Sequence, residues 1–304
     1  MEGVLILGGT GMIGSKLSID LTNQGYDVKI LSTKPSTAEN VFYYNYKTES
    51  VDMKAFDNVQ HIIHLAGANI GEKRWFRKRK QEIVESRVKP ILFIKKVLSR
   101  ENITLKTFIS ASAVGFYGSN ESKSSWFSEY SPSGSDFLSN VCVAWENAAN
   151  SMSENAERIV ILRTGIVLSE KGGVYTKLYK FVSLGLGTVI GSGNQYMPWI
   201  HIDDLSRLYL TVLEQPDMLG VYNAVAPDVI DNSEFMHVFA KSLNRGVFPI
   251  YVPKILLKVV IGRRSILLTK GVHCVSNRLQ KSDFKFLYPN LKDAILNISK
   301  RESK

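Results

Sequence analysis

Short apolar segments alternate with segments of helical periodicity along the first half of the chain. Ile13, Leu17 and Leu21 recur on one helix face until Gly25, a residue type that commonly ends helices. A further helix is expected to begin near Asp136, where apolar side chains again recur on one stripe. The apolar runs between such helices predict strands at residues 4–7, 28–31, 61–65, 108–109 and 159–162. This repetition predicts a parallel sheet with helices on both faces.

The alternating pattern changes after about residue 170. Glycines punctuate a loop-rich stretch there, at positions Gly172, Gly173, Gly185, Gly187, Gly191 and Gly193. We therefore expect an α/β protein in two parts. Residues 1–170 form a doubly wound domain, to which residues of about 198–226 return, and residues 171–304 form a smaller C-terminal α/β lobe that faces a substrate.

Composition is that of an ordinary globular protein. The chain has 304 residues, of which 44% are hydrophobic and 22% charged, enough for one large domain and a smaller one. Two distant cysteines form neither a disulfide framework nor a zinc spacing, and Glu2 stands where a secretory signal is basic, so a cytoplasmic location is expected. The longest apolar stretch, about residues 255–268, is interrupted by Lys258, Arg263 and Arg264, so no membrane partner is expected.

The formal net charge of +10 raises the question of an anionic partner. Six basic residues fall within residues 73–80, and glutamates flank them. Their spacing relative to Ile83 and Val84 is typical of a helix with one solvated face. No aromatic RNA-binding motif, zinc knuckle or helix-turn-helix signature accompanies them, so nucleic acid is not expected as a partner.

The strongest local signal is a glycine-rich turn between the first predicted strand and the first predicted helix. It comprises Gly8, Gly9, Thr10, Gly11, Met12, Ile13 and Gly14. Gly8 permits a tight turn, Gly11 lets the backbone approach a pyrophosphate, and Gly14 lets the helix pack against the sheet. A pyrophosphate at the helix N-terminus meets unpaired N–H groups and the positive end of the helix dipole. The turn therefore predicts a Rossmann-type dinucleotide site.

The end of the second predicted strand distinguishes between the nicotinamide cofactors. NAD-specific proteins usually place a carboxylate there, which accepts a hydrogen bond from the ribose 2′-hydroxyl. This chain instead has Ser32, Thr33 and Lys34. The lysine and the two hydroxyls are able to hold a 2′-phosphate through charge-assisted hydrogen bonds. We therefore predict NADP(H) as the cofactor, the alternative being that Lys34 is an ordinary loop lysine.

The spacing G-x-x-G-x-x-G resembles that of the extended short-chain dehydrogenase/reductases. Further segments strengthen the resemblance: residues 64–67 (HLAG), 110–118 (SASAVGFYG) and 199–204 (WIHIDD). Within that superfamily the chain is similar to the atypical group called epimerase family proteins, which has a human member of the 39U type. Landmarks of that group run over nearly the whole chain, at residues 66–70, 74–75, 86–87, 145–146, 163–168, 172–173 and 284–286. The resemblance implies that Leu65, Ala66 and Gly67 line the cofactor, and Arg163 is assigned to the cofactor-binding residues as well.

The chain departs from this superfamily at the catalytic positions. Ordinary members use a Tyr-x-x-x-Lys pair on the helix after the serine-containing strand, and the lysine lowers the pKa of the tyrosine. Here the four-residue spacing falls on Cys142 and Glu146, which share one helix face. A thiol beside a carboxylate has a raised pKa, which is wrong for a nucleophile or a base.

Two interpretations of this departure stay open, and a third ranks behind them. In the first, the chain is an NADP(H)-dependent oxidoreductase of a small carbonyl or alcohol. Its candidate catalytic residues are then Ser112, which polarises a substrate oxygen, Glu146 as a general base or ribose ligand, Tyr117 as a spare phenol, and Cys142. In the second, the chain binds NADP(H) with little turnover and acts through a protein partner. Nucleotide-sugar epimerisation ranks third, because it needs retained NAD and an intact tyrosine.

The remaining signals are smaller. His201 lies in an apolar run and is expected to be a core residue, and the histidines show no metal-binding spacing, so no metal is predicted. Trp75, Trp199 and Tyr196 are candidates to line a substrate cleft, or to pack between the two parts of the chain. By analogy with extended members that pair through two helices, a homodimer is expected.

Overall fold

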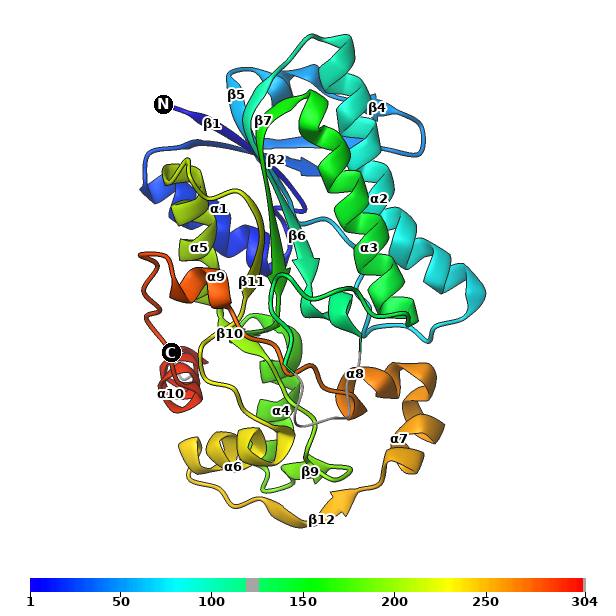
Figure 1. Cartoon of the computed structure of the whole chain (residues 1–304), viewed down its shortest axis with the longest axis vertical. Helices are drawn as coiled ribbons and strands as arrows, with labels where there is room; N and C mark the ends of the chain where they lie inside the picture. Colours follow the sequence, from blue (N-terminus) through cyan, green and yellow to red (C-terminus); the bar gives the residue numbers. More distant parts are fainter. Residues whose placement is uncertain (119–125, 303–304) are drawn as a thin grey trace.

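The computed structural model describes residues 1–118 and 126–302, and an eight-stranded sheet forms its centre (Figure 1). The strands are β1 (Gly3–Leu7), β2 (Asp27–Ser32), β3 (Val41–Asn45), β4 (Ser50–Val51), β5 (Val59–His64), β6 (Leu105–Ala113), β7 (Ala156–Thr164) and β11 (Gly220–Ala224). Their order is β11-β7-β6-β5-β1-β2-β3-β4, and the neighbours are parallel except β3 with β4. The chain winds outward in one direction from β1 and in the other from β5. A ligand crevice typically forms at such a switch point, beyond the carboxyl ends of the strands.

The central strand β1 is apolar throughout because helices cover both faces of the sheet. These helices are α1 (Met12–Asn23), α2 (Arg77–Arg100), α3 (Phe137–Asn150) and α5 (Ile202–Glu214). Val4 and Ile6 are buried in the core that contains α1 and α5. Leu5 and Leu7 are buried in the core that contains α2 and α3. Figure 1 shows these two helix layers on opposite sides of the sheet, which explains why a strand such as β1 has no polar position.

A smaller lobe follows in the C-terminal half and has a core of its own, in which Trp199, Phe235 and Ile295 are fully buried. Two short parallel pairs join β8 (Ile166–Ser169) with β10 (Trp199–His201) and β9 (Thr188–Ile190) with β12 (Phe248–Val252). The remaining helices are α4 (Gly173–Ser183), α6 (Asn232–Ser242), α7 (Lys254–Ile261), α8 (Ile266–Thr269), α9 (Asn277–Gln280) and α10 (Leu291–Glu302). Short 3₁₀ helices are η1 (Met53–Phe56), η2 (Val114–Tyr117), η3 (Ser151–Glu154) and η4 (Gly262–Ser265). Among the helices of residues 1–118 and 126–302, none has both the length and the apolar character that crossing a membrane requires.

The predicted fold class is confirmed, since the centre is a mostly parallel Rossmann-like sheet between two helix layers. Each predicted strand lies within or at the end of an observed one, and the helix expected near Asp136 begins at Phe137. Its N-terminus is capped by the Asp136 carboxylate, which accepts a hydrogen bond from the Ser139 N–H. The segment of residues 198–226 divides between the two parts. β10 pairs with β8 in the small lobe, whereas α5 packs on α1 and β11 pairs with β7 in the central sheet.

The basic stretch of residues 73–80 differs from the predicted helix with a solvated face. The helix α2 begins only at Arg77, and Trp75 is buried before it. Arg79 is also buried, and its guanidinium donates to the Asn69 carbonyl oxygen. The solvated surface is confirmed for Lys73, Arg74, Arg77 and Lys78, which are exposed. The prediction was wrong for Arg79 because the loop before α2 folds back over the first turn of the helix.

Candidate cofactor and catalytic site

The glycine-rich turn connects β1 to α1 at the switch point of the sheet. Gly8 has a φ of +82°, and a Cβ atom there would lie 2.8 Å from the backbone nitrogen of Ala66, in the loop after β5. A Cβ atom on Gly14 would lie 2.5 Å from the Gly8 carbonyl oxygen. No side chain fits at these distances, so both glycines hold backbone segments in contact. The glycine turn and the loop after β5 thus meet through backbone atoms at the carboxyl ends of β1 and β5. We refer to the turn and the loop together as the cradle.

The cradle presents the N-terminus of α1. Its N-cap residue is Gly11, no side chain caps the helix, and its first turn holds no acidic residue. Thr10 and Gly11 are exposed, whereas Met12 lies beside Gly172 and Ile13 packs against the core. Unpaired N–H groups and the helix dipole favour an anion at this end. The residues present therefore fit the pyrophosphate of a dinucleotide.

The turn after β2 lies at the side of the cradle where a Rossmann site meets the adenosine ribose. The buried Ser32 hydroxyl accepts a hydrogen bond from the Lys34 N–H at 3.0 Å and donates to the Lys34 carbonyl oxygen at 2.9 Å. Thr33 and Lys34 are exposed. Residues 32–38 contain no carboxylate that would oppose a 2′-phosphate. Lys34 and Thr33 thus have the chemistry of a phosphate site, while Ser32 shapes the turn.

The loop after β5 forms the opposite wall of the cradle. Leu65 extends the pairing of β5 with β1, since its N–H donates to the Leu7 carbonyl oxygen at 2.8 Å. Ala66 then lies against Gly8, and Gly67 is exposed. Neighbouring parallel strands thus bring the three predicted loop residues to the glycine turn.

Arg87 of α2 lies directly beside this loop, although the sequence alone marks it only as part of a family landmark. Its guanidinium carbon is 3.0 Å from the position of a Cβ built on Gly67, and its Nη1 donates to the carbonyl oxygens of Ala68 and Ile83. Burial lowers the pKa of Arg87 to about 10, which leaves it charged at neutral pH. Besides burial, the groups that act on this pKa are Cys142 and Arg79, with no carboxylate of the described residues among them. Arg87 therefore places an unneutralised cation beside the cradle.

A second cluster of predicted residues lies at the carboxyl ends of β6 and β7. Ser112 and Arg163 are directly paired across these strands, and Glu146 reaches both from α3. The Ser112 hydroxyl donates to Glu146 Oε1 at 2.6 Å. Arg163 donates to both carboxylate oxygens of Glu146, each at 2.8 Å. All three side chains are buried.

The cluster continues from Arg163 to Tyr117. Arg163 Nη1 donates to the Tyr117 hydroxyl oxygen at 3.0 Å, and the Tyr117 hydroxyl donates to Asn223 Oδ1 at 2.7 Å. Burial raises the pKa of Tyr117. Burial lowers the pKa of Arg163, but its hydrogen bonds and the charge of Glu146 outweigh burial and raise it. Tyr117 therefore links β7 with β11 inside the protein.

This geometry limits what the cluster can do chemically. A bidentate arginine stabilises an ionised carboxylate, so Glu146 has to leave Arg163 before it can take a proton. The single Ser112 proton already points to Glu146, so this hydroxyl meets a further group as an acceptor. The catalytic roles of Ser112, Tyr117 and Glu146 and the cofactor role of Arg163 stay predictions. Their observed contacts join β6, α3, β7 and β11.

Cys142 lies one helical turn before Glu146 and is buried. Burial and, less strongly, the Glu146 charge raise the pKa of its thiol to about 11, against the opposing effects of Arg87 and of hydrogen bonds with Ser112 and the Ala113 backbone. The predicted direction of this shift is confirmed, although burial rather than the carboxylate is its main cause. A thiol that stays protonated is a poor nucleophile, but it is suited to donate a proton.

The predicted cleft aromatics take part in packing. Trp199 is fully buried in the small lobe, Trp75 is buried between α2 and α3, and the Tyr196 ring stacks on that of His273 with centroids 4.2 Å apart. His201 is a core residue, as expected. Its Nδ1 accepts a hydrogen bond from the Asp203 N–H in the first turn of α5 at 3.1 Å. Burial lowers the pKa of His201 to about 4.

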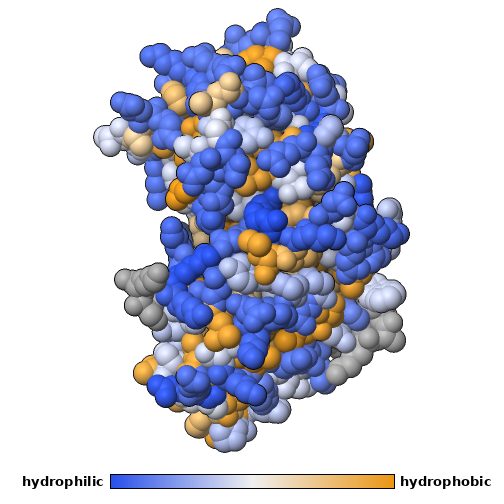
Figure 2. Space-filling model, turned by 90° about the vertical axis from the view of Figure 1, so that its left-hand side faces the viewer, coloured by the Kyte–Doolittle hydropathy of each residue, from blue (hydrophilic) through white to orange (hydrophobic). Residues whose placement is uncertain are grey.

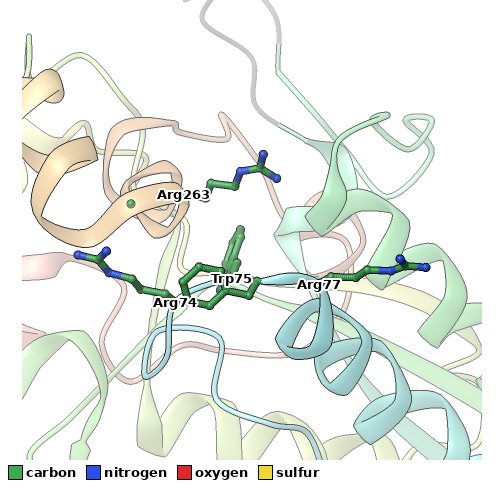
Figure 3. A pocket seen from close by; sticks show the side chains of 6 residues that line it. Arg74, Trp75, Arg77 and Arg263 are labelled. Carbon is green, nitrogen blue, oxygen red and sulfur yellow. The ribbon is translucent and has the colours of Figure 1, made fainter.

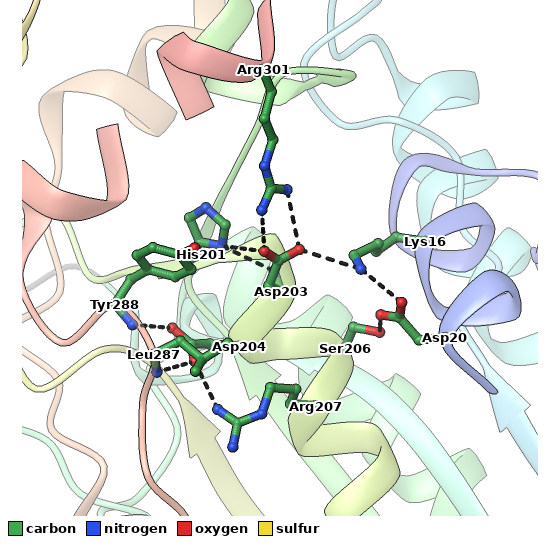
Figure 4. A network of polar contacts seen from close by, with 10 residues as sticks. All are labelled: Lys16, Asp20, His201, Asp203, Asp204, Ser206, Arg207, Leu287, Tyr288 and Arg301. Atoms are coloured by element: carbon green, nitrogen blue, oxygen red, sulfur yellow. Dashed lines mark hydrogen bonds and ion pairs between the residues drawn. The ribbon is translucent and has the colours of Figure 1, made fainter. Parts of the chain in front are cut away.

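Close to His201, charged side chains connect α1 and α5 of the central domain with α10 of the small lobe. Asp203 of α5 pairs with Arg301 of α10 and, at 3.4 Å, with Lys16 of α1 (Figure 4). Lys16 also pairs with Asp20 at 2.7 Å. This network has partners for its charges within the protein, so it is a structural connection between the lobes rather than a second site.

Comparison with known proteins places this arrangement in a family. A model of the NAD dependent epimerase/dehydratase family matches residues 4–225, and a domain of unknown function, DUF1731, matches residues 252–298. Epimerase family protein SDR39U1 of Homo sapiens is 31% identical over 299 residues, which are 97% of this chain and 99% of the human protein. The chain belongs to the SDR39U1-like epimerase family. Its fold is that of NAD(P)-binding epimerase and short-chain dehydrogenase proteins.

Other proteins similar to this SDR39U1-like chain support the assignment. Epimerase family protein YfhF of Bacillus subtilis is 32% identical over 298 residues, 96% of each chain. A crystal structure of human SDR39U1 (isoform 2) with NADPH has a TM-score of 0.89 at 31% identity and covers 98% of this chain and 99% of the human one. UDP-N-acetylglucosamine 4-epimerase from Bacillus cereus shares the fold at 16% identity, with a TM-score of 0.78 over both whole chains. The family predicted from the sequence is confirmed.

Proposed function

We propose that this SDR39U1-like chain binds NADP(H) and is an oxidoreductase of a small carbonyl or alcohol. The cofactor site is supported by the cradle of Gly8 and Gly14, the uncapped α1 and the turn at Lys34. Human SDR39U1, with the same fold and NADPH in its structure, supports the same cofactor. The observation that carries the proposal is the direct contact of the glycine turn with the loop at Ala66.

The chain's own residues divide the binding work. The α1 N-terminus takes the pyrophosphate, Lys34 pairs with the 2′-phosphate, and Arg87 supplies a cation beside Gly67. When bound, a nicotinamide cofactor supplies two-electron redox chemistry. Two backbone carbonyls, that of Ala68 in the loop after β5 and that of Ile83 in α2, accept hydrogen bonds from Arg87 Nη1 and keep this side chain from swinging away.

Cys142 is the proposed proton donor. It occupies the helix position at which ordinary short-chain dehydrogenases carry the tyrosine, and its raised pKa of about 11 keeps its Sγ protonated at neutral pH. Ser112 and Arg87 both lower the pKa of this thiol. The thiol therefore lies between the carboxyl end of β6, which carries Ser112, and the loop after β5, beside which Arg87 lies. Glu146 and Arg163 hold Ser112 in position rather than react. The substrate class follows from this arrangement, since a protonated thiol suits an oxygen that gains negative charge.

Cofactor binding is tested by titrating the purified protein with NADPH and NADH and following nicotinamide fluorescence. We expect NADPH to bind about tenfold more tightly or better, as one added charge-assisted contact provides. Equal affinities would contradict the role of Lys34. If neither dinucleotide binds, the cofactor proposal fails.

Turnover is tested by NADPH consumption with a panel of small aldehydes and ketones at high enzyme concentration. Cys142→Ser is expected to lower kcat by about tenfold or more with unchanged NADPH affinity, because a serine hydroxyl is a much weaker acid than a thiol. Cys274→Ser is the matched control, since Cys274 is also a buried thiol but lies beside Tyr117 and Val225. Equal effects of the two substitutions would remove Cys142 from the mechanism.

A second function is supported by the closed network around Glu146, in which both oxygens of the Glu146 carboxylate already accept hydrogen bonds. In this case the chain senses NADP(H) and acts through a protein partner. The distinguishing result is tight NADPH binding without turnover on any carbonyl. Affinity capture of partners with and without NADPH then decides, because recovery of the same partners in both conditions excludes sensing.

A further inference from the structure

One surface of the small lobe is used by neither the cofactor nor the proposed chemistry. It is formed by β12 and α7, and we refer to it as the β12–α7 surface. Its apolar side chains and their exposed fractions are Ile250 (65%), Tyr251 (50%), Ile255 (78%), Leu256 (53%) and Val259 (70%). Ile255, Leu256 and Val259 share one face of α7 and point away from the protein. Figure 2 shows the opposite side of the small lobe, away from α7, where hydrophobic residues also reach the surface at the lower end of the molecule.

The sequence segment that contains this surface is rich in basic residues and has no acidic ones. Residues 235–282 contain no aspartate or glutamate, and their basic residues are Lys241, Arg245, Lys254, Lys258, Arg263, Arg264, Lys270, Arg278 and Lys281. This single segment accounts for +9 of the formal net charge of +10. Lys254 and Lys258 are exposed on α7, and Arg263 is exposed in η4 directly after it. Cations therefore border the apolar face of α7, and no carboxylate of its own segment does.

The basic border continues into a hollow of about 420 Å³ between η4 and the start of α2 (Figure 3). The residues that line it are Arg74, Trp75, Phe76, Arg77, Gly262 and Arg263, with no carboxylate among them. Phe76 is 70% exposed at its edge. Figure 3 shows the three guanidinium groups spread apart rather than converging on one point. This spacing suits several anions distributed over a plane better than a single phosphate.

We propose that the β12–α7 surface docks on an anionic lipid bilayer, with α7 lying in the plane of the interface. An apolar helix face bordered by lysine and arginine is typical of helices that lie on membranes. The ring of Tyr251 suits the headgroup level. Lysine is depleted at protein–protein interfaces, so Lys254 and Lys258 favour lipid over an acidic protein.

This contact departs from the expectation that the chain has no membrane partner, which rested on the lack of a membrane span, and the contact itself requires none. Lys258 and Arg263, which interrupt the apolar stretch of residues 255–268, rule that stretch out as a span. In a surface contact the same charges lie at headgroup level while the aliphatic side chains enter the acyl boundary. The docking is independent of the proposed NADP(H) chemistry, because α7 and the glycine turn belong to different parts of the chain.

The direct test is sedimentation of the full chain with vesicles of phosphatidylcholine, with and without phosphatidylserine. We expect binding to the phosphatidylserine vesicles that is about tenfold stronger or more than to phosphatidylcholine alone, and that weakens as salt increases. Absence of binding to the anionic vesicles at low salt overturns the proposal.

Matched variants locate the contact. Ile255→Glu with Val259→Glu removes the apolar face, and Leu92→Glu on α2, at a position 42% exposed, is the control. We expect the paired variant to lose vesicle binding by about tenfold or more and the control to keep it. NADPH titration of each variant checks that the central domain is intact. Vesicle binding that survives loss of the apolar face overturns the proposal.

A second pair separates local charge from net charge. Lys254→Glu with Lys258→Glu changes α7, while Lys292→Glu with Lys300→Glu makes the same change at exposed positions on α10, across the lobe from α7 (Figure 1). Only the α7 pair is expected to lose binding. Equal losses would show general electrostatic attraction and overturn the proposal. Concentration-dependent dimers in light scattering, abolished by Ile255→Glu without any lipid binding, would assign the surface to a second copy instead.

Discussion

Two clusters at the carboxyl edge of the sheet use their polar groups in opposite ways. At the glycine turn, the N–H groups of α1 have no capping side chain, and the turn at Lys34 holds no acidic residue. Around Glu146, both carboxylate oxygens accept hydrogen bonds from Arg163, and Ser112 donates to one of them. The first cluster is arranged to receive an anion from outside, whereas the second is satisfied within the protein. Nearness to the crevice therefore does not by itself make a polar residue a ligand.

Breaking the Glu146–Arg163 pair is expected to have the largest effect. Glu146→Leu leaves a buried guanidinium without its carboxylate, which costs about 3–5 kcal/mol of the free energy of unfolding. The double variant Glu146→Leu with Arg163→Met removes both charges and is expected to recover much of that loss. Urea denaturation of the three proteins measures the difference. Wild-type stability of Glu146→Leu, combined with lost turnover, would make Glu146 catalytic rather than structural.

The cluster at the glycine turn is tested by adding a side chain where the cradle has none. In Gly14→Ala the new Cβ lies 2.5 Å from the Gly8 carbonyl oxygen, so the turn has to open. We expect NADPH affinity to fall by about hundredfold, the equivalent of about 2.7 kcal/mol, within the usual range for overpacking. Gly246→Ala is the control, because no atom lies within 4 Å of its Cβ position. Full affinity in Gly14→Ala would place the cofactor elsewhere.

The contrast between the clusters also explains what the sequence was able to predict. The glycine turn is contiguous in sequence and stands between a strand and a helix, so its form follows from local rules. The doubly wound fold follows in the same way from apolar runs and helical periodicity. β3 was missed because only Tyr44 of that strand is buried, which leaves too weak a pattern.

The second cluster depends on tertiary packing instead. Ser112 and Glu146 are 34 residues apart, and Glu146 and Arg163 are 17 apart. Their contacts require the register of β6 with β7 and the placement of α3, which no periodicity specifies. Arg87 was missed as a site residue for the same reason, since nothing local to α2 shows that it meets the loop at Gly67.

A buried histidine at the end of β5, next to both clusters, predicts a pH dependence of stability. His64 is fully buried, its Nδ1 accepts the Trp145 Nε1–H at 3.2 Å, and burial lowers its pKa to about 3. In the unfolded chain a histidine has a pKa of about 6.5, so the unfolded state binds more protons below that pH. Stability is therefore lost as pH falls from about 6.5 toward 3, by about 2 kcal/mol between pH 7 and 5.

This dependence is measured by urea unfolding at pH 7 and pH 5. His64→Asn keeps an acceptor for Trp145 but does not titrate, so its free energy of unfolding is expected to fall less than that of the wild type. His237→Asn, at an exposed position, is the control and is expected to keep the full decrease. An equal decrease in His64→Asn would show that other groups carry the pH dependence.

The smallest expected effect concerns the preference for NADPH over NADH at the turn that contains Lys34. Lys34→Glu replaces the cation with a carboxylate that repels a 2′-phosphate and accepts a hydrogen bond from a 2′-hydroxyl. We expect NADPH affinity to fall by about tenfold while NADH affinity rises, an exchange of about 1.4 kcal/mol or more. Lys47→Glu, at another exposed position of the central domain, makes the same charge change away from the turn. A parallel loss of both dinucleotides in Lys34→Glu would assign Lys34 to general attraction, since a specific 2′-phosphate contact has to move the two affinities in opposite directions.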